Sequence, residues 1–170
     1  MSLPAAGRSS SSSEPERLVL PVDCCRLRRF APGSGSRGEG IQMATGSVEV
    51  ELKASADDAW AAVGDFAGVD KIFPGLDSLV IEEDDRILGM FGMEIRERLL
   101  ELDNEQRRLV YSVIDGVPLE SHKGIITVEE VGSGSKVTWA YEVTPDEMAD
   151  IFGSTYAGAL EQLKKHFGEE

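Results

Sequence analysis

The sequence contains only two cysteines and two histidines among its 170 residues. Cys24 and Cys25 are adjacent, so they cannot link distant parts of a fold, and two thiols are too few for a four-cysteine metal site. The histidines, His122 and His166, form neither a His-Glu-x-x-His nor a His-x-His pattern. We therefore expect no metal site, and the scarcity of cysteine indicates a reducing, cytoplasmic compartment.

Long apolar runs and excess positive charge are also missing. The chain has no stretch of 18 apolar residues, which predicts that no segment spans a membrane. Its 17 Lys and Arg are outnumbered by 31 Asp and Glu, and the formal net charge of -14 repels phosphate backbones and anionic lipid heads. Nucleic acid is therefore not an expected partner. The phosphate-binding pattern Gly-x-x-x-x-Gly-Lys-[Ser/Thr] is absent as well, so we expect no cofactor.

The composition of the chain changes near residue 43. Residues 1–42 hold the run Ser9–Ser13, four of the seven prolines, and six Arg against four acidic residues. Such a tract, with one short apolar patch at Leu18–Val22, cannot bury enough surface to offset the entropy lost on ordering. We predict a disordered N-terminal extension over residues 1–43 and a single domain over residues 44–170.

Two other interpretations of the N-terminal tract stay open. Translation could start at Met43, just before the regular pattern begins. A transit peptide to an organelle would explain the abundant Arg and Ser, but the four acidic residues and the lack of a clear amphipathic helix argue against it. A secretory signal is not expected, because no apolar segment follows a basic start.

The first elements after this tract are predicted to be a strand and two short helices. Val48, Val50 and Leu52 alternate with charged residues, as in a half-buried strand. A helix is expected from Ser55, with Asp58 three residues on as in a capping box, to Gly64. A second short helical segment is expected over residues 66–72, before the Phe-Pro-Gly turn.

Strands and one long helix account for the rest of the chain. Strands are predicted over residues 79–83, 86–90, 93–102, 108–114, 120–130 and 136–143, with short turns between them that favour an antiparallel meander. The last helix is expected to start at Thr144 as its cap, with Pro145 in the first turn. It would run for roughly 23 residues, or about 34 Å.

This order of elements predicts an α+β fold. We expect a curved antiparallel sheet of about seven strands wrapped on the long C-terminal helix, with two short helices after the first strand. A long sheet must curl, and one amphipathic helix cannot fill a wide concave face. An apolar cavity between the sheet and the helix is the consequence.

The same order resembles the helix-grip superfamily, also called SRPBCC or START-like, which includes polyketide cyclase/dehydrase-like and birch-pollen-allergen-like proteins. The resemblance covers roughly residues 46–168. It is carried by the segments Ala54–Trp60, Asp65–Phe66, Phe73–Gly75, Glu97–Asp103, Tyr111, Val137–Trp139 and Leu160–Lys164, in that order. It implies a START-like ligand-binding domain with a solvent-shielded cavity for a lipid, a polyketide or a similar hydrophobic molecule.

Some features of relatives do not match this sequence. The gate and latch of plant hormone receptors of this fold are replaced by Gly89–Gly92 and Val117–Leu119, so hormone sensing is not assigned. Enzyme-like relatives use a pocket Arg and Glu. Glu97 resembles that Glu, but the expected strand has its arginine, Arg86, at its very start, so we leave the arginine unassigned.

Strand parity selects the candidate site residues, because side chains alternate between the two faces of a strand. Glu97 is in phase with Met93 and Ile95, and on the following strands Tyr111, His122 and Tyr141 are in phase with apolar residues. These four polar groups are predicted to point into one concave face. The predicted ligand-binding residues are Trp60, Phe73, Met93, Ile95, Tyr111, Trp139, Tyr141, Phe152 and Tyr156.

Two functions remain in competition. The first is a carrier or sensor, a monomer or homodimer, that binds a small hydrophobic molecule. The second is a cyclase, dehydratase or isomerase with Glu97 as acid or base and His122 or Tyr111 assisting. An interaction module of a larger complex is a third alternative. Each residue also has a purely structural alternative: Glu97 could pair with a cation, His122 could make a satisfied hydrogen bond, and the tyrosines could be core residues.

Overall fold

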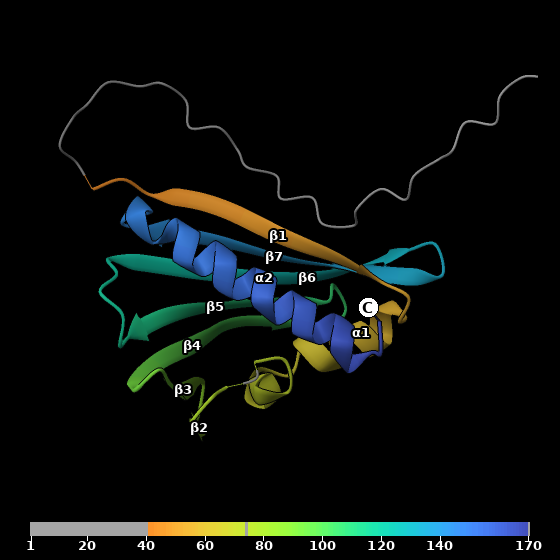
Figure 1. Ribbon diagram of the computed structural model, residues 1–170, viewed down its shortest axis with the longest axis horizontal. Helices are drawn as coiled ribbons and strands as arrows, with labels where there is room; N and C mark the ends of the chain where they lie inside the picture. Colours follow the sequence, from red (N-terminus) through yellow and green to blue (C-terminus); the bar gives the residue numbers. More distant parts are fainter. Residues whose placement is uncertain (1–40, 74, 170) are drawn as a thin grey trace, which may run out of the picture.

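The computed structural model describes residues 41–73 and 75–169 (Figure 1). Most of the N-terminal tract, with its predicted disorder and its two alternatives, lies outside these residues. The described elements, in order, are β1 Ala44–Leu52, α1 Ala56–Val63, η1 Phe66–Lys71, β2 Ser78–Glu82, β3 Asp85–Met90, β4 Met93–Asp103, β5 Arg108–Asp115, β6 Ser121–Val131, β7 Gly134–Thr144, η2 Asp146–Met148 and α2 Ala149–His166.

The strands form one antiparallel sheet of seven in the order β1-β7-β6-β5-β4-β3-β2. Strands β2 to β7 follow one another as a meander, and β1 adds to the open edge of β7, with Val48 opposite Trp139. The sheet curves around α2, which crosses its concave face diagonally (Figure 1). The α+β helix-grip prediction, with about seven strands, is confirmed.

The two short helices lie between β1 and β2, as the sequence predicted. Ser55 caps α1, because its hydroxyl oxygen accepts a hydrogen bond from the Asp58 backbone N–H at 3.1 Å. Gly64 follows the last residue of α1, and η1 is a 3₁₀ segment rather than an α-helix. Phe66 and Val69 of η1 are buried and join the core.

The start of the last helix differs from the sequence prediction. Thr144 does not cap a helix, because it is the final residue of β7 and pairs with Ser121. The short segment η2 follows Pro145, and α2 begins only at Ala149. With 18 residues, α2 is about 27 Å long, shorter than expected. The strand pairing of Thr144 therefore outweighs its capping preference.

The core lies under the part of α2 from Tyr156 onward. Tyr156, Ala159, Leu160 and Leu163 are the buried residues of this helix, and they pack with residues of β1, β6, β7 and α1. The Trp139 ring of β7 stacks on Tyr156 with 4.4 Å between ring centroids. This arrangement leaves the N-terminal half of α2 to face β3, β4 and β5. Within the described residues, no helix has both the length and the hydrophobicity needed to span a membrane.

Candidate functional site

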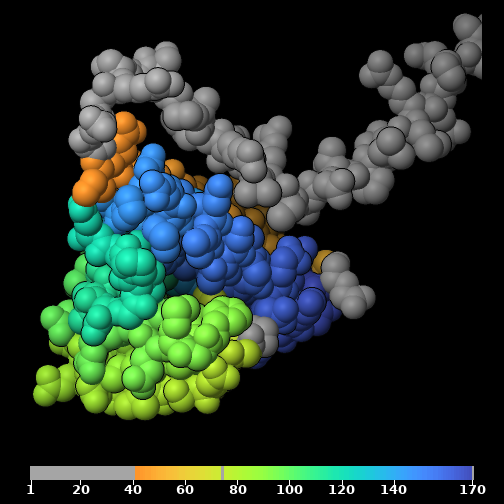
Figure 2. Space-filling view, turned by 60° about the vertical axis from the view of Figure 1, so that its left-hand side comes forward, coloured from red at the N-terminus to blue at the C-terminus, as the bar shows by residue number. Residues whose placement is uncertain are grey.

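A cavity of about 280 Å³ lies between the N-terminal half of α2 and strands β3, β4 and β5. The surface is hollowed in this region, between the blue helix and the green strands (Figure 2). Side chains from the strands, the turns between them and the helix line it: Phe73, Arg86, Leu88, Met90, Phe91, Met93, Ile95, Glu97, Tyr111, Val113, Gly116, Val117, Pro118, Met148, Ile151, Phe152, Thr155 and Tyr156.

Strand alternation explains how β4 contributes to the wall. Met93, Ile95 and Glu97 are two residues apart, so all three side chains point to the concave face, as parity predicted. Gly116 follows β5 with a φ of 88°, and a Cβ there would collide with the Glu94 carbonyl oxygen. Glycine at this position lets the β5–β6 loop pack closely against β4 beside the cavity.

Arg86 and Glu97 form a buried ion pair on the cavity wall. Arg86 Nε donates to Glu97 Oε2 at 2.6 Å, and the side chains are only 4% and 9% exposed. Arg86 Nη1 also donates to the Phe66 carbonyl oxygen at 2.8 Å, and its guanidinium lies over the Phe66 ring at 4.1 Å. The arginine that sequence reasoning left unassigned is therefore Arg86.

A register argument could have found this pair. The β3–β4 turn has two residues, Phe91 and Gly92, both with positive φ, and this geometry aligns Arg86 directly with Glu97. The strands predicted over residues 79–83 and 86–90 place the preceding turn at Asp84 and Asp85, one residue too late. In the structure that turn is at residues 83 and 84, so Asp85 begins β3 and Arg86 is its second residue.

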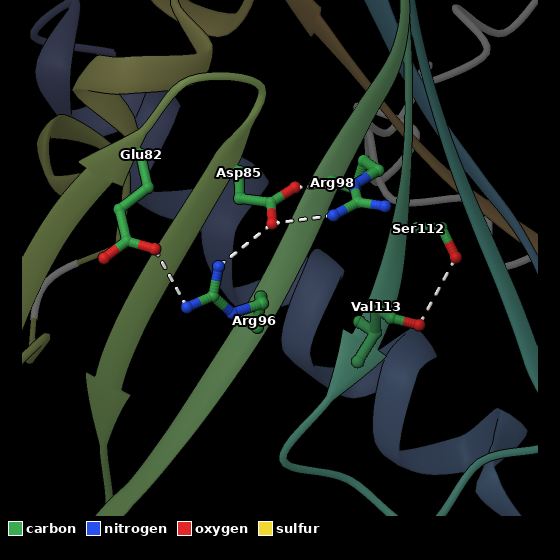
Figure 3. A network of polar contacts seen from close by, with 6 residues as sticks. All are labelled: Glu82, Asp85, Arg96, Arg98, Ser112 and Val113. Atoms are coloured by element: carbon green, nitrogen blue, oxygen red, sulfur yellow. Dashed lines mark hydrogen bonds and ion pairs between the residues drawn. The ribbon is translucent and has the colours of Figure 1, made fainter.

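The opposite face of β3 and β4 carries a second charge network (Figure 3). Asp85 accepts hydrogen bonds from Arg98 Nε at 2.7 Å and from Arg96 Nη1 at 3.0 Å, and Arg96 also binds Glu82. Arg98 and, secondarily, Arg96 lower the pKa of the Asp85 carboxyl to about 2. This network ties β2, β3 and β4 together on the side away from the cavity, and so fixes the strands that present Arg86 and Glu97.

Two tyrosine hydroxyls meet beside the cavity in a hydrogen-bonded cluster. The hydroxyls of Tyr111 and Tyr156 are 2.8 Å apart. Trp139 Nε1 donates to the Tyr111 hydroxyl oxygen at 3.2 Å, and His122 Nε2 lies 2.9 Å from the Tyr156 hydroxyl. Burial is the main cause that raises the pKa of both tyrosines, so both hydroxyls keep their protons.

His122 stands behind these tyrosines rather than on the cavity wall. Its Nδ1 accepts a hydrogen bond from the Val113 backbone N–H at 3.0 Å, which requires that Nδ1 carry no proton. Burial lowers the pKa of His122 to about 4, so the ring is neutral near pH 7 and its proton is on Nε2. His122 therefore orients Tyr156 instead of facing a bound molecule.

The structure places most of the predicted site residues on the wall. Glu97, Phe73, Met93, Ile95, Tyr111, Phe152 and Tyr156 line the cavity. The other predicted residues, Trp60, Trp139, Tyr141 and His122, do not line it.

Each of these four side chains is engaged elsewhere. Trp60 Nε1 donates to Asn104 Oδ1 at 3.1 Å, away from the cavity. Trp139 forms a hydrogen bond with the Tyr111 hydroxyl, and His122 forms one with the Tyr156 hydroxyl. Tyr141 is in phase with the concave face, but its ring packs against Phe152 and Tyr156. The tyrosine that completes the polar cluster is therefore Tyr156 of α2, not Tyr141.

Several wall residues were not selected from the sequence. Val113 shares the parity of Tyr111, so strand alternation could have selected it. Phe91, Val117 and Pro118 lie in turns, and Ile151 in the first turn of α2, where no periodic pattern marks a cavity residue. Phe91 and Ile151 are 84% and 57% exposed, which places them at the mouth.

A curved seven-stranded sheet that grips one long helix over an apolar cavity defines the class of this protein as helix-grip. The family model described as polyketide cyclase/dehydrase and lipid transport matches residues 43–168. The chain therefore belongs to this family. A comparison with curated protein sequences gave no match.

Solved structures of similar fold include bacterial and plant proteins. The protein XoxI from Bacillus cereus is 26% identical, with a TM-score of 0.69, over 73% of this chain and 95% of its own. A protein from Thermobifida fusca is 27% identical, with a TM-score of 0.67, over 73% and 93% of the two chains. Norcoclaurine synthase from Thalictrum flavum, in complex with dopamine and hydroxybenzaldehyde, has 20% identity and a TM-score of 0.61 over 79% and 95%, a likeness in fold.

Proposed function

We propose that this protein binds a small hydrophobic molecule in the cavity under α2 and acts as its carrier or sensor. The observation that supports the proposal is the mostly apolar composition of the cavity wall. Its side chains are apolar or aromatic apart from the tyrosine hydroxyls, Thr155 and one ion pair between Arg86 and Glu97. Such a lining, with a few convergent polar groups, is typical of small-molecule sites.

The size of the cavity and the family support the same proposal. About 280 Å³ is close to the lower end of small-molecule pockets, which run from about 300 to 1,000 Å³. Membership of the polyketide cyclase/dehydrase and lipid transport family favours an apolar ligand. The likeness to norcoclaurine synthase adds only that a protein of this fold holds small aromatic molecules.

Native mass spectrometry of the protein purified from its own host tests the proposal. We expect a co-purified molecule bound in one copy, released on denaturation and recovered in organic solvent. Val113→Phe fills the cavity from β5 and should abolish the bound mass, whereas Val131→Phe, at the exposed end of β6, should keep it. An empty wild-type protein in every preparation, or a bound mass that survives Val113→Phe unchanged, would count against a ligand in this cavity.

A second candidate function is catalysis of a cyclase, dehydratase or isomerase type in the same cavity. The observation that favours it is the position of Glu97, whose carboxylate is on the wall and paired with Arg86 at 2.6 Å. A carboxylate in this position can take a proton from a bound substrate. The same experiment separates the two functions when Glu97→Gln is added. A carrier holds the same molecule in both proteins, but an enzyme holds product in the wild type and unreacted substrate in the variant.

A further inference from the structure

The tyrosine cluster has more hydrogen-bond donors than it has hydrogen bonds. Its four donors are Trp139 Nε1–H, His122 Nε2–H and the hydroxyls of Tyr111 and Tyr156. Its acceptors are the two hydroxyl oxygens. The cluster has three contacts, so it uses three of the four protons, and the fate of the fourth depends on the direction of each bond.

Two of these directions are fixed by the structure. Trp139 has only a donor to offer, so it donates to the Tyr111 oxygen. The Val113 backbone N–H occupies the Nδ1 lone pair of His122, so His122 must donate from Nε2 to the Tyr156 oxygen. Neither Trp139 nor His122 can therefore accept a tyrosine proton.

The direction of the third hydrogen bond, between Tyr111 and Tyr156, does not change the number of protons left without an acceptor. If Tyr111 donates to Tyr156, the hydroxyl proton of Tyr156 has no acceptor in the cluster; if Tyr156 donates, the proton of Tyr111 has none. No hydrogen bond joins either hydroxyl to Glu97 within the described part of the chain. Tyr111 and Tyr156 are 1% and 3% exposed, and both line the cavity. One buried hydroxyl proton is thus left for a molecule in the cavity.

The charge of the wall restricts what that molecule can be. Arg86 and Glu97 are the only charged residues that line the cavity in the described structure, and they neutralise each other. A ligand carboxylate or ammonium group would be buried without a free counter-charge, which is costly. A neutral group avoids this cost.

We propose that the cavity is specific for neutral carbonyl compounds, such as ketones, aldehydes or esters on an apolar body, whose oxygen accepts the spare proton of the Tyr111–Tyr156 pair. A carbonyl oxygen accepts without adding a proton of its own, whereas an alcohol brings a proton that needs an acceptor of its own in an apolar cavity. This inference rests on the proposed binding function and adds the chemical class of the ligand.

Binding of matched naphthalene derivatives, substituted at the same ring position and measured by isothermal titration calorimetry, tests the inference. Acetylnaphthalene carries the ketone, ethylnaphthalene lacks it, naphthylethanol carries an alcohol and naphthoate carries a carboxylate. We expect the ketone to bind roughly three- to tenfold more tightly than the hydrocarbon, as one net hydrogen bond allows. The alcohol and the carboxylate should both bind more weakly than the ketone.

Tyrosine variants make the test specific to this cluster. The double variant Tyr111→Phe/Tyr156→Phe removes both hydroxyls and should abolish the preference for the ketone while keeping the hydrocarbon site. Each single variant leaves one hydroxyl whose proton has no acceptor, so each should keep a preference. Tyr141→Phe is the matched control, because Tyr141 does not line the cavity, and it should behave as the wild type.

An infrared measurement on the wild type does not depend on whether the variants fold. The carbonyl stretch of bound acetylnaphthalene should lie at lower frequency than that of the same ketone in hexane. Equal affinity for ketone and hydrocarbon, tighter binding of the alcohol or carboxylate, or an unshifted carbonyl band would each overturn the inference but leave the proposed function intact. If no member of the series binds, the hydrocarbon included, the proposed function itself fails.

Discussion

Glu97 is the residue whose interpretation changes most between sequence and structure. Parity predicted that it points to the cavity, and it does, but it does so as half of an ion pair with Arg86. The pair brings two charges into an apolar wall, which is tolerable only because they contact each other at 2.6 Å. A buried pair of this kind is sensitive to the loss of one partner.

We therefore expect Glu97→Leu to destabilise the protein by about 3–5 kcal/mol, because Arg86 is left buried without a counter-charge. The double variant Arg86→Met/Glu97→Leu should cost less than Glu97→Leu alone. Urea unfolding followed by circular dichroism measures both. Glu101→Gln is the control, since Glu101 pairs with Arg108 at the surface and should cost less than about 1 kcal/mol. A Glu97→Leu cost no larger than that of the control would contradict this account of the pair.

His122 makes stability depend on pH. Burial lowers the pKa of its ring from the ordinary value of 6.5 to about 4 in the folded protein. The unfolded chain therefore binds a proton more readily, so the contribution of His122 to stability is complete above about pH 6.5 and is lost as the pH falls to about 4. The difference in pKa corresponds to about 3 kcal/mol over this window.

Replacing the ring tests this dependence. Chemical denaturation at a series of pH values measures the free energy of unfolding of the wild type and of His122→Gln. Most of the loss of stability between pH 6.5 and 4 should be absent from the variant, because the glutamine side chain does not titrate. His166→Gln, a change at the exposed end of α2, should leave the wild-type profile unaltered. A profile for His122→Gln as steep as that of the wild type would show that another group titrates.

At the scale of elements, the β2–β3–β4 region is held by charges on one face and lines the cavity with the other. Asp85 is buried and bridges Arg96 and Arg98 on the outer face (Figure 3), while the adjacent Arg86 faces inward. Because successive residues of a strand point to opposite faces, the outer network and the inner ion pair share the same two strands. Loss of the outer Asp85 network should therefore disturb the inner Arg86–Glu97 ion pair, and the reverse.

The Asp85 network gives a second pH dependence, separate from that of His122. The folded pKa of about 2 is below the ordinary value of 3.8, so Asp85 contributes stability that is complete above pH 3.8 and is lost as the pH falls to about 2. We expect Asp85→Asn to lower the melting temperature at pH 7 and to flatten its fall below pH 4. Glu82→Gln, at the exposed end of the network, should change the melting temperature less. Equal effects would mean that Asp85 has no special role.

Regular elements were predictable because their signals are local. The alternation of Val48, Val50 and Leu52 and the Ser55 cap were sufficient for β1 and α1. Thr144 shows where local signals fail, since it has the features of a helix cap but is paired as a strand residue with Ser121. A cap preference worth about 1 kcal/mol does not outweigh continuation of a whole ladder.

The candidate site was predictable only in part, for a physical reason. Parity assigns a strand residue to one face of the sheet. It does not show which part of the concave face is covered by side chains of the helix and which part stays open. Tyr141 and Trp139 point to the correct face, but Phe152 and Tyr156 of α2 pack against Tyr141 and Tyr156 stacks on Trp139, so neither side chain lines the cavity. Arg86 depends on where the turn before β3 ends, and Phe91 lies in a turn, and a periodic pattern fixes neither position.

At the scale of the whole molecule, the cavity follows from the mismatch between a wide curved sheet and a single helix. The C-terminal half of α2, with Leu163 fully buried, packs in the core together with β1, β7 and α1, while the N-terminal half stands over β3 to β5 with open space beneath it. The fold thus combines a closely packed half, which holds the core, with an open half, which holds the cavity.

The most direct test of this account is to locate a bound apolar molecule. In ¹H–¹⁵N correlation spectra, titration with ethylnaphthalene should shift the amide signals of Ile95, Val113 and Phe152 on the cavity wall. The signals of Val48, on the edge strand β1, and of Glu129, near the last residue of β6, should stay in place because neither residue lines the cavity. Val113→Phe should suppress the shifts. Perturbations centred on the outer face of the sheet, or shifts that persist in Val113→Phe, would contradict a ligand site between the sheet and α2.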